Sequence, residues 1–185
     1  LAPPLIFGGT VAAMAHHQHH HDDAPVAPLR AKVLTVSDGV VAGTRDDTGG
    51  AGVAELLRTA GWDVVERAVT PDGDDAVARA LVGLCDGFHG LVVTTGGTGF
   101  GPRDRTPEGT LAVVDRQAPG LAEAMRLVNP LGRLSRAVAG TRGTALVVNT
   151  PGSSKGSVET LGAVLDVLGH AVRLLVDNAD AHPGP

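Results

Sequence analysis

A continuous apolar run without alternation constrains the fold of this chain more than any other segment. The run extends from Gly90 to Thr95 with the sequence GLVVTT, and a glycine-rich loop follows it directly. A strand with one solvent-exposed face alternates apolar and polar residues, so this run predicts a strand buried on both faces. Such strands are typical of parallel sheets covered by helices on each side. The composition agrees, because 43% of the residues are hydrophobic but only 2% are aromatic, which favours a core of Val, Leu and Ala.

Strand-like and helix-like segments alternate along the rest of the chain. We expect further strands at residues 31–36, 62–69 and 144–149, and helices at residues 48–60, 74–85, 120–127 and 158–176, with one more beginning at residue 106. Thr48 and Thr106 are the expected helix N-caps, and Gly169 marks an expected break in the last helix. Together these segments predict an α/β fold: a single three-layer, doubly wound domain over residues 30–185, with a mostly parallel central sheet.

The first 29 residues do not follow this pattern. Residues 1–15 are apolar but contain two prolines and two glycines, and they are shorter than the roughly 20 residues that a membrane-spanning helix requires. Five of the residues from 16 to 21 are histidines, a tract that binds metal ions adventitiously but lacks the spacing of an ordered site. We therefore interpret residues 1–29 as a His-rich extension that is tag-like or disordered.

Charge and cysteine content exclude several classes of function. The formal net charge is −5 and the isoelectric point is about 5.9, without any run of Lys and Arg, so neither nucleic acid nor an anionic membrane is an expected partner. Cys85 is the single cysteine, which excludes a disulfide framework and a cysteine-based zinc site. We expect Cys85 to be a buried, unreactive thiol and the protein to be cytoplasmic.

Candidate functional residues lie in three loops that follow predicted strands. In a doubly wound fold, ligands bind at the carboxyl ends of the strands, where helix N-termini present free N–H groups. The loops begin at Ser37-Asp38, at Gly96 and at Pro151. We therefore expect these loops to meet at one edge of the sheet.

The loop after the central strand, GGTGFG at residues 96–101, has the composition of a phosphate-binding loop. Glycines tolerate positive φ and let successive N–H groups surround an anion. The loop is not a Rossmann fingerprint, because Pro102 occupies the position of the third glycine. Residues 152–155 are not a P-loop either, because Ser154 precedes Lys155 where a glycine is required. On spacing alone, a plain glycine-rich turn is as good an interpretation.

Asp72, which follows a predicted strand, and Asp104, at the end of the glycine-rich loop, are the acidic candidates for chemistry near these loops. Taken as isolated features, they are better interpreted as turn or helix-capping residues. A nucleotide site, however, requires oxygen ligands for a hard cation that neutralises the phosphates, and two loop carboxylates can supply them.

Several motifs, taken together and in order, resemble the MogA/MoaB family of molybdenum-cofactor biosynthesis proteins, which includes the G domain of gephyrin. The most specific is TTGGTGFGPRD at residues 94–104, continued by Thr106-Pro107-Glu108. The supporting segments are Thr35-Val36-Ser37-Asp38, Thr70-Pro71-Asp72, Ser135-Arg136 and Pro151-Gly152-Ser153-Ser154-Lys155-Gly156. The resemblance therefore covers almost the whole chain from residue 33 onward.

The resemblance implies a molybdopterin adenylyltransferase. In that reaction the terminal phosphate of molybdopterin attacks the α-phosphorus of ATP, with magnesium present, to give adenylylated molybdopterin and pyrophosphate. Asp72 and Asp104 match functionally important aspartates of the family and are the candidate catalytic and Mg²⁺-binding residues. The resemblance also implies a homotrimer and a downstream metal-insertion partner similar to MoeA.

The remaining candidate residues would bind the substrates. The nucleotide or pterin phosphate is assigned to Thr95, Gly96, Gly97, Thr98 and Gly99. The pterin or another part of the substrate is assigned to Ser37, Asp38, Ser135, Arg136, Pro151, Gly152, Ser153, Ser154 and Lys155, with Arg136 or Lys155 as a cationic clamp. Turn chemistry and surface charge explain these side chains equally well when each is taken alone.

Two other functions remain open at this point. Arg105, Gly109 and Ser154 depart from the usual family pattern, but none of them removes a proposed catalytic group. A non-catalytic MoaB-like protein that binds pterin or serves as an interaction module is the main alternative. The other alternative is a nucleotide-binding domain with other chemistry, which would need a different acceptor group. The sequence does not distinguish a molybdenum pathway from a tungsten pathway.

Overall fold

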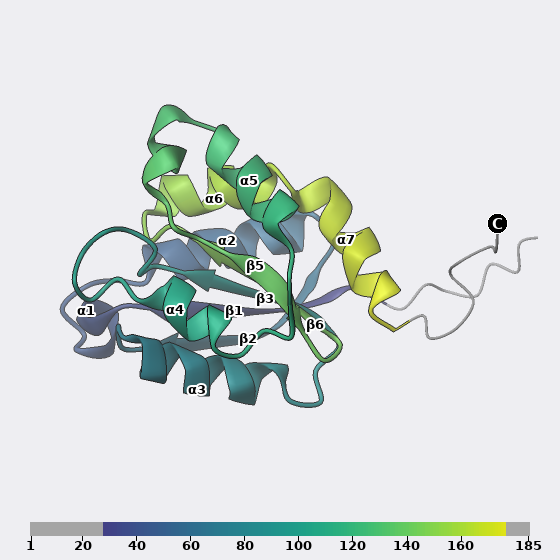
Figure 1. Cartoon of the computed structure of the whole chain (residues 1–185), viewed down its shortest axis with the longest axis horizontal. Coiled ribbons are helices and arrows are strands. Elements are labelled where there is room, and N and C mark those ends of the chain that lie inside the picture. The colour runs from purple at the N-terminus through teal and green to yellow at the C-terminus, as the bar shows by residue number, and fades with distance from the viewer. Residues whose placement is uncertain (1–27, 177–185) are drawn as a thin grey trace, which may run out of the picture.

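The four expected strands and two further short ones form one six-stranded sheet in the order β2-β1-β3-β6-β5-β4 (Figure 1). The structure is a computed structural model that describes residues 28–176. Its strands are β1 (Arg30–Val36), β2 (Asp63–Thr70), β3 (Gly90–Thr95), β4 (Arg116–Gln117), β5 (Ala139–Arg142) and β6 (Ala145–Thr150). Its helices are α1 (Asp38–Val41), α2 (Thr48–Thr59), α3 (Asp74–Cys85), α4 (Thr106–Leu111), α5 (Pro119–Leu127), the 3-10 helix η1 (Pro130–Leu134), α6 (Ser154–Gly162) and α7 (Leu165–Leu174).

Strand β3 lies at the centre of the sheet, as its uninterrupted apolar sequence predicts. It pairs in parallel with β1 on one side and with β6 on the other, and all six of its residues are buried. β1 also pairs in parallel with β2, whereas β4–β5 and β5–β6 are antiparallel. The prediction of a mostly parallel sheet is therefore confirmed.

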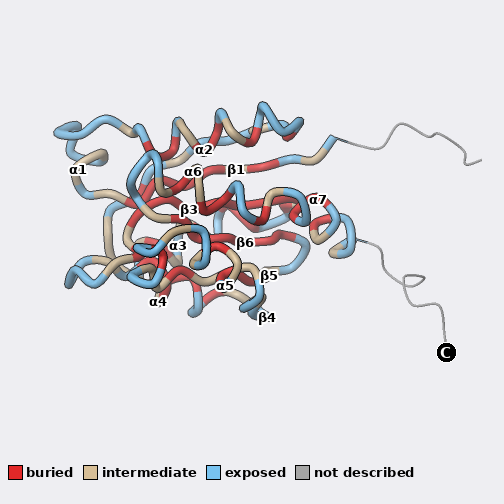
Figure 2. Tube along the Cα trace, turned by 90° about the horizontal axis from the view of Figure 1, so that it is seen from above, coloured by how far each residue is buried: buried red, intermediate tan, exposed pale blue. Residues whose placement is uncertain are grey.

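Alternate residues of the central strands enter two separate cores. On one face, Leu91 and Val93 of β3 pack in a core with α2, α5, α6 and α7. On the other face, Val92 packs in a core with α3 and the segment after α4. Buried backbone accordingly runs through the middle of the molecule, with exposed residues mainly on the outer helices and loops (Figure 2). The three-layer, doubly wound architecture is confirmed, because consecutive residues of a strand point to opposite faces.

The predicted capping threonines are one residue away from the true N-caps. Asp47, not Thr48, caps α2, and its carboxylate accepts a hydrogen bond from the N–H of Gly50. Thr106 is the first residue of α4 rather than its cap, and its hydroxyl donates to the carbonyl of Gly96. The partner of the Thr106 hydroxyl is a carbonyl ten residues earlier, at the start of the loop that leads into α4, and a local capping pattern does not show this contact.

The C-terminal helical segment is divided at a different place from the one expected. The prediction of a break near Gly169 is wrong, because the chain leaves α6 after Gly162 and begins α7 at Leu165. Gly169 is buried within α7, where a Cβ would approach the side chain of Leu29 to 2.8 Å. This glycine therefore allows close packing of the helix instead of interrupting it.

Two short strands and the short helix α1 have no counterpart in the expectations. Strands β4 and β5 have only two and four residues, too few for a periodic pattern to indicate. Gly143, with a φ of +53°, lies between the antiparallel strands β5 and β6. These antiparallel additions extend the sheet beyond the four parallel strands.

Strands β1 and β3 are neighbours in the sheet although β2 lies between them in the sequence. The chain leaves β1 toward α2 on one face of the sheet, and it enters β3 from α3 on the other face. This divergence makes the carboxyl ends of β1 and β3 a topological switch point, the place where ligands bind in folds of this kind.

Three expectations concern features outside the sheet. Cys85 is buried as expected, and burial raises the pKa of its thiol to about 11. In the part of the chain that the structure describes, no helix is both long and apolar enough to cross a membrane. Of the expected His-rich extension, residues 1–27 lie outside the described residues.

A buried amide links the central strands to α4 and provides a test of the fold. The Asn149 side chain donates to the hydroxyls of Thr94 and Thr110 at 3.0 Å and accepts from the N–H of Val138 at 3.3 Å. We expect Asn149→Ala to lower the free energy of unfolding by about 2–4 kcal/mol, because it leaves buried polar partners unpaired and creates a cavity. Urea unfolding followed by circular dichroism measures the change. Val167→Ala, at an exposed position of α7, is the control and should change the free energy of unfolding by no more than about 0.5 kcal/mol. Equal changes in the Asn149→Ala and Val167→Ala variants would contradict the prediction.

Candidate functional site

A cleft of about 980 Å³ lies at the carboxyl ends of β1, β3 and β6. The three loops identified in the sequence meet there because parallel strands end at the same edge of the sheet. Most of the predicted site residues line this cleft: Ser37, Asp72, Thr95, Gly96, Gly97, Thr98, Gly99, Asp104, Ser135, Pro151, Gly152, Ser153 and Lys155. Asp38, Arg136 and Ser154 do not line it.

Two consecutive glycines begin the loop after β3, and the backbone requires glycine at both positions. Gly96 has a φ of +106°, and a Cβ there would lie 2.2 Å from the carbonyl oxygen of Val36. Gly97 has a φ of +62°, and a Cβ there would lie 2.3 Å from the hydroxyl of Thr106. The loop thus passes close to both β1 and α4, which only residues without a side chain permit.

The Asp72 side chain is held beside this loop by a reciprocal contact with Asp38. The N–H of Asp38 donates to Asp72 Oδ2 at 2.8 Å, and the N–H of Asp72 donates to Asp38 Oδ1 at 3.1 Å. Arg103 donates two hydrogen bonds to the Asp38 carboxylate and one to the Asp72 carbonyl. Asp38 therefore positions Asp72, while the second Asp72 oxygen, Oδ1, faces Gly97.

Asp104 lies at the far end of the same loop. Its Oδ2 atom accepts a hydrogen bond from the N–H of Gly101 at 2.8 Å, and the N–H of Asp104 donates to the Gly101 carbonyl at 3.0 Å. A Cβ on Gly99 would lie 2.9 Å from this oxygen, so the carboxylate is packed against the loop backbone. Asp72 and Asp104 thus face different glycines of one loop, with the cleft in contact with both.

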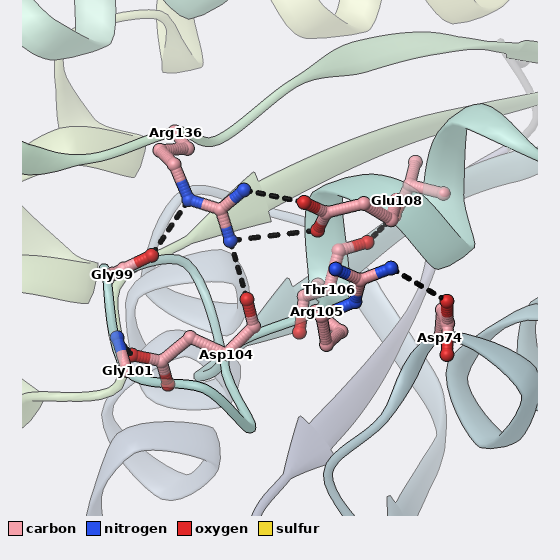
Figure 3. Close-up of polar contacts among 9 residues, drawn as sticks. Asp74, Gly99, Gly101, Asp104, Arg105, Thr106, Glu108 and Arg136 are labelled. Carbon is pink, nitrogen blue, oxygen red and sulfur yellow. Dashed lines mark hydrogen bonds and ion pairs between the residues drawn. The ribbon is translucent and has the colours of Figure 1, made fainter.

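Arg136 contacts the backbone of the loop (Figure 3) and does not line the cleft. Its guanidinium donates to the carbonyls of Gly99 and Asp104 and forms an ion pair with Glu108. The Arg136 hydrogen bond lowers the pKa of Glu108 below its usual value. This guanidinium is occupied by protein groups, so the structure does not present it to the cleft as a cationic clamp.

The loop after β6 forms the third border of the cleft. The Thr95 hydroxyl donates to the carbonyl of Pro151 at 2.8 Å, which joins this loop to the end of β3. Ser153 is the N-cap of α6, and its hydroxyl accepts from the N–H of Gly156. Lys155 is 86% exposed in its side chain and lies 3.6 Å from Glu159, so it remains accessible to an anion in the cleft. Ser154 begins α6 outside the lining.

Asp47 is a cleft residue that the sequence analysis missed. Its carboxylate accepts from the hydroxyl of Thr35 at 2.8 Å and from the N–H of Gly50, and it pairs with Arg67. An aspartate directly before a helix is a recognised capping signal, so its position was detectable in the sequence. Its contacts with Thr35 of β1 and Arg67 of β2 were not detectable there.

An apolar wall of the cleft was also missed. Pro130, Leu131 and Leu134 of η1 line one side, and Leu131 and Leu134 are 74% and 57% exposed. The Asn129 side chain accepts from the N–H groups of Leu131 and Gly132, which fixes the start of η1. No local pattern places this segment opposite the glycine-rich loop, because α5 and η1 are brought there by the packing of the whole domain.

Known proteins share this fold and much of the sequence. A family model described as "Probable molybdopterin binding domain" matches residues 32–170. The chain belongs to this family. The molybdopterin adenylyltransferase of Escherichia coli K12 is 38% identical over 151 residues, which cover 78% of this chain and 77% of the relative.

Two solved structures support the same family. The molybdopterin biosynthesis enzyme MoaB from Thermus thermophilus is 45% identical with a TM-score of 0.75, covering 80% of this chain and 96% of that one. The molybdopterin biosynthesis Mog protein from Mycobacterium ulcerans is 37% identical with a TM-score of 0.73, covering 80% of this chain and 99% of that one. Membership of the MogA/MoaB family of molybdopterin biosynthesis proteins, expected from the motifs, is confirmed.

The pair of Glu108 and Arg136 predicts how stability depends on pH. Since the pKa of Glu108 is lower in the folded protein than its usual value of 4.5, the pair stabilises the fold above that pH and loses this effect as the pH falls through the lowered value. We expect Glu108→Gln to show a smaller loss of unfolding free energy between neutral pH and about pH 3 than the unsubstituted protein. Denaturant unfolding at a series of pH values measures this loss.

Glu55→Gln is the matched control for this prediction. Glu55 is exposed on α2 and forms no ion pair with any residue between 28 and 176. Its variant should follow the unsubstituted protein across the pH series. A Glu108→Gln curve that also follows the unsubstituted protein would mean that the ion pair does not contribute to acid sensitivity.

Proposed function

We propose that this protein transfers AMP from ATP to the terminal phosphate of molybdopterin, with Mg²⁺ as the metal. The observation that carries the proposal is the placement of Asp72 and Asp104 against one glycine-rich loop, in one cleft at the switch point of the sheet. The identity to molybdopterin adenylyltransferases supports it. The main function of such a site is alignment and charge neutralisation, so no protein nucleophile is required.

The loop after β3 has the donors that a phosphate group needs. Within the described residues, the N–H groups of Gly97, Thr98 and Gly99 have no hydrogen-bond acceptor, and all three residues line the cleft. Successive N–H groups in a glycine-rich turn bind phosphate oxygens. We therefore assign the nucleotide or pterin phosphate to residues 95–99.

The two carboxylates fit a magnesium ion that is completed by substrate. No cluster of three or more His, Cys, Asp or Glu side chains that could hold a metal occurs among residues 28–176. Mg²⁺ is commonly bound through one or two carboxylates together with substrate phosphates, so Asp72 and Asp104 suffice as protein ligands. When bound, the ion would neutralise charge on the phosphates.

The proposed reaction is a nucleotidyl transfer. An oxygen of the terminal phosphate of molybdopterin forms a bond to the α-phosphorus of ATP, the bond from this phosphorus to the bridging oxygen breaks, and pyrophosphate leaves. Lys155 and the hydroxyls of Ser37 and Ser153 border the cleft and can bind anionic or polar groups of the substrates. The apolar wall formed by Leu131 and Leu134 suits the flat pterin ring.

A non-catalytic MoaB-like binding role is the second candidate. The Thermus thermophilus MoaB structure is 45% identical and the Escherichia coli adenylyltransferase 38% identical, so similarity to MoaB stands beside similarity to the adenylyltransferases. The retention of Asp72 and Asp104 in the cleft favours the enzyme instead. A turnover assay separates the two.

We also propose a homotrimer in the cytoplasm that delivers its product to a MoeA-like metal-insertion protein. Family resemblance supports this proposal. Leu127 is exposed and does not line the cleft, so it offers an apolar side chain for contacts between subunits. Sedimentation equilibrium of the purified protein distinguishes a trimer from a monomer.

Removing the charge of either proposed metal ligand should reduce turnover. We expect Asp72→Asn and Asp104→Asn each to lower the rate of adenylylated molybdopterin formation by at least about tenfold, because each removes charge from a metal-assisted step. Pyrophosphate release with saturating ATP, Mg²⁺ and molybdopterin measures the rate. Asp63→Asn is the matched control, since Asp63 is exposed at the amino end of β2, away from the cleft.

Each outcome of this assay decides a specific point. A wild-type rate in a folded Asp72→Asn or Asp104→Asn variant would remove that residue from the mechanism. Molybdopterin binding without product in the unsubstituted protein would favour the MoaB-like binding role. Product formed from a nucleotide with a different acceptor would favour a nucleotide-binding domain with other chemistry.

A further inference from the structure

The carbonyl groups of the loop after β3 are held by two residues from outside the loop. Thr106 holds the first two, because its hydroxyl donates to the Gly96 carbonyl at 2.9 Å and its N–H donates to the Gly97 carbonyl at 3.0 Å. Arg136 holds the next two, because its N–H donates to the Thr98 carbonyl at 2.9 Å and its Nε donates to the Gly99 carbonyl at 2.7 Å. Four consecutive carbonyls are therefore bound by protein donors.

This arrangement determines where the loop donors point. In a planar trans peptide, the N–H of one residue is directed opposite to the carbonyl of the residue before it. Holding the carbonyls of residues 96–99 thus directs the N–H groups of residues 97–100 away from Thr106 and Arg136. None of these four N–H groups has an acceptor in the described part of the chain, and residues 97–99 line the cleft.

The Arg136 guanidinium spans the whole loop. Besides Gly99, it donates to the carbonyl of Asp104, the proposed metal ligand at the end of the loop (Figure 3). Glu108 on α4 binds the other edge of the guanidinium, and the Phe100 ring lies 6.0 Å from its central carbon. A planar guanidinium with five donors can bind separate acceptors in this way, whereas a lysine ammonium lacks that planar fork.

We propose that Arg136 is a positioning residue, which sets the phosphate-binding conformation of residues 96–104 through their carbonyls and does not touch the substrate. The part of the proposal that concerns the ligand rests on the proposed function. The part that concerns the loop does not, because the hydrogen bonds exist in the protein without any ligand. Glu108 supports the same role by fixing the guanidinium in place.

The test compares two substitutions of arginine by lysine. Arg136→Lys keeps the positive charge but loses the planar set of guanidinium donors. Arg105→Lys is the matched control, because Arg105 directly precedes α4 as its N-cap residue and its side chain pairs with Asp74 at 2.9 Å without contacting the loop carbonyls. Thermal unfolding first establishes that both variants are folded.

Hydrogen–deuterium exchange of the ligand-free proteins is the deciding measurement. The N–H groups of Gly101, Asp104 and Thr106 form hydrogen bonds within or next to the loop, so their exchange reports how firmly it is held. We expect exchange at these positions to be at least about fivefold faster in Arg136→Lys, given the hydrogen bonds lost, and unchanged in Arg105→Lys. Calorimetry with ATP and Mg²⁺ should show at least about fivefold weaker binding in Arg136→Lys only.

Unchanged exchange in a folded Arg136→Lys variant would overturn the proposal. If nucleotide binding were nevertheless weaker, the Arg136 guanidinium would contact the substrate directly. If the unsubstituted protein bound no ATP, the proposed function would fail, but the exchange result would still decide the role of Arg136. Should Arg136→Lys not fold, Glu108→Gln replaces it, with faster exchange at the same N–H groups expected and unchanged exchange overturning the proposal.

Discussion

Burial of β3 on both faces is the constraint on which the other features of this protein depend. A strand in this position requires partners along both edges and helices over both faces, and the chain supplies them with β1, β6 and the two helix layers. The end of such a strand cannot continue into either layer without a sharp change of direction. Gly96 and Gly97 make that change, and the loop they begin becomes the floor of the cleft.

The cleft combines a backbone that is held by hydrogen bonds with side chains that remain free to bind a ligand. Asp38 and Arg103 hold Asp72 from one side, while Thr106 and Arg136 hold the loop from the other. Two of the arginines near the site thus bind protein groups and shape the loop. Lys155 is the contrasting cation, because its side chain is mostly exposed at the cleft border. For phosphate chemistry, such a division keeps the donors aligned before the substrates arrive.

Much of this organisation was predictable from local patterns. Uniform apolar character identified β3, helical spacing identified α3 with its correct bounds, and the order of motifs identified the family. Errors arose where a contact outside the local pattern takes the role that the pattern predicts. Thr106 has the sequence features of an N-cap, yet its hydroxyl binds the Gly96 carbonyl. Gly169 has the features of a helix break, yet it lies buried in α7 beside Leu29.

Local patterns in the sequence were enough to assign the α/β class, the parallel central strands, the family and the loops that form the cleft. These features follow from periodicity and from residues whose backbone preferences are local. The direction in which the polar groups face came from the packing of the whole domain. This packing directed the Arg136 guanidinium to the loop carbonyls, placed Asp47 in the cleft and brought Leu131 and Leu134 to its edge. Those outcomes depend on which distant donors, acceptors and apolar surfaces the packed sheet brings within reach, and no local pattern encodes that.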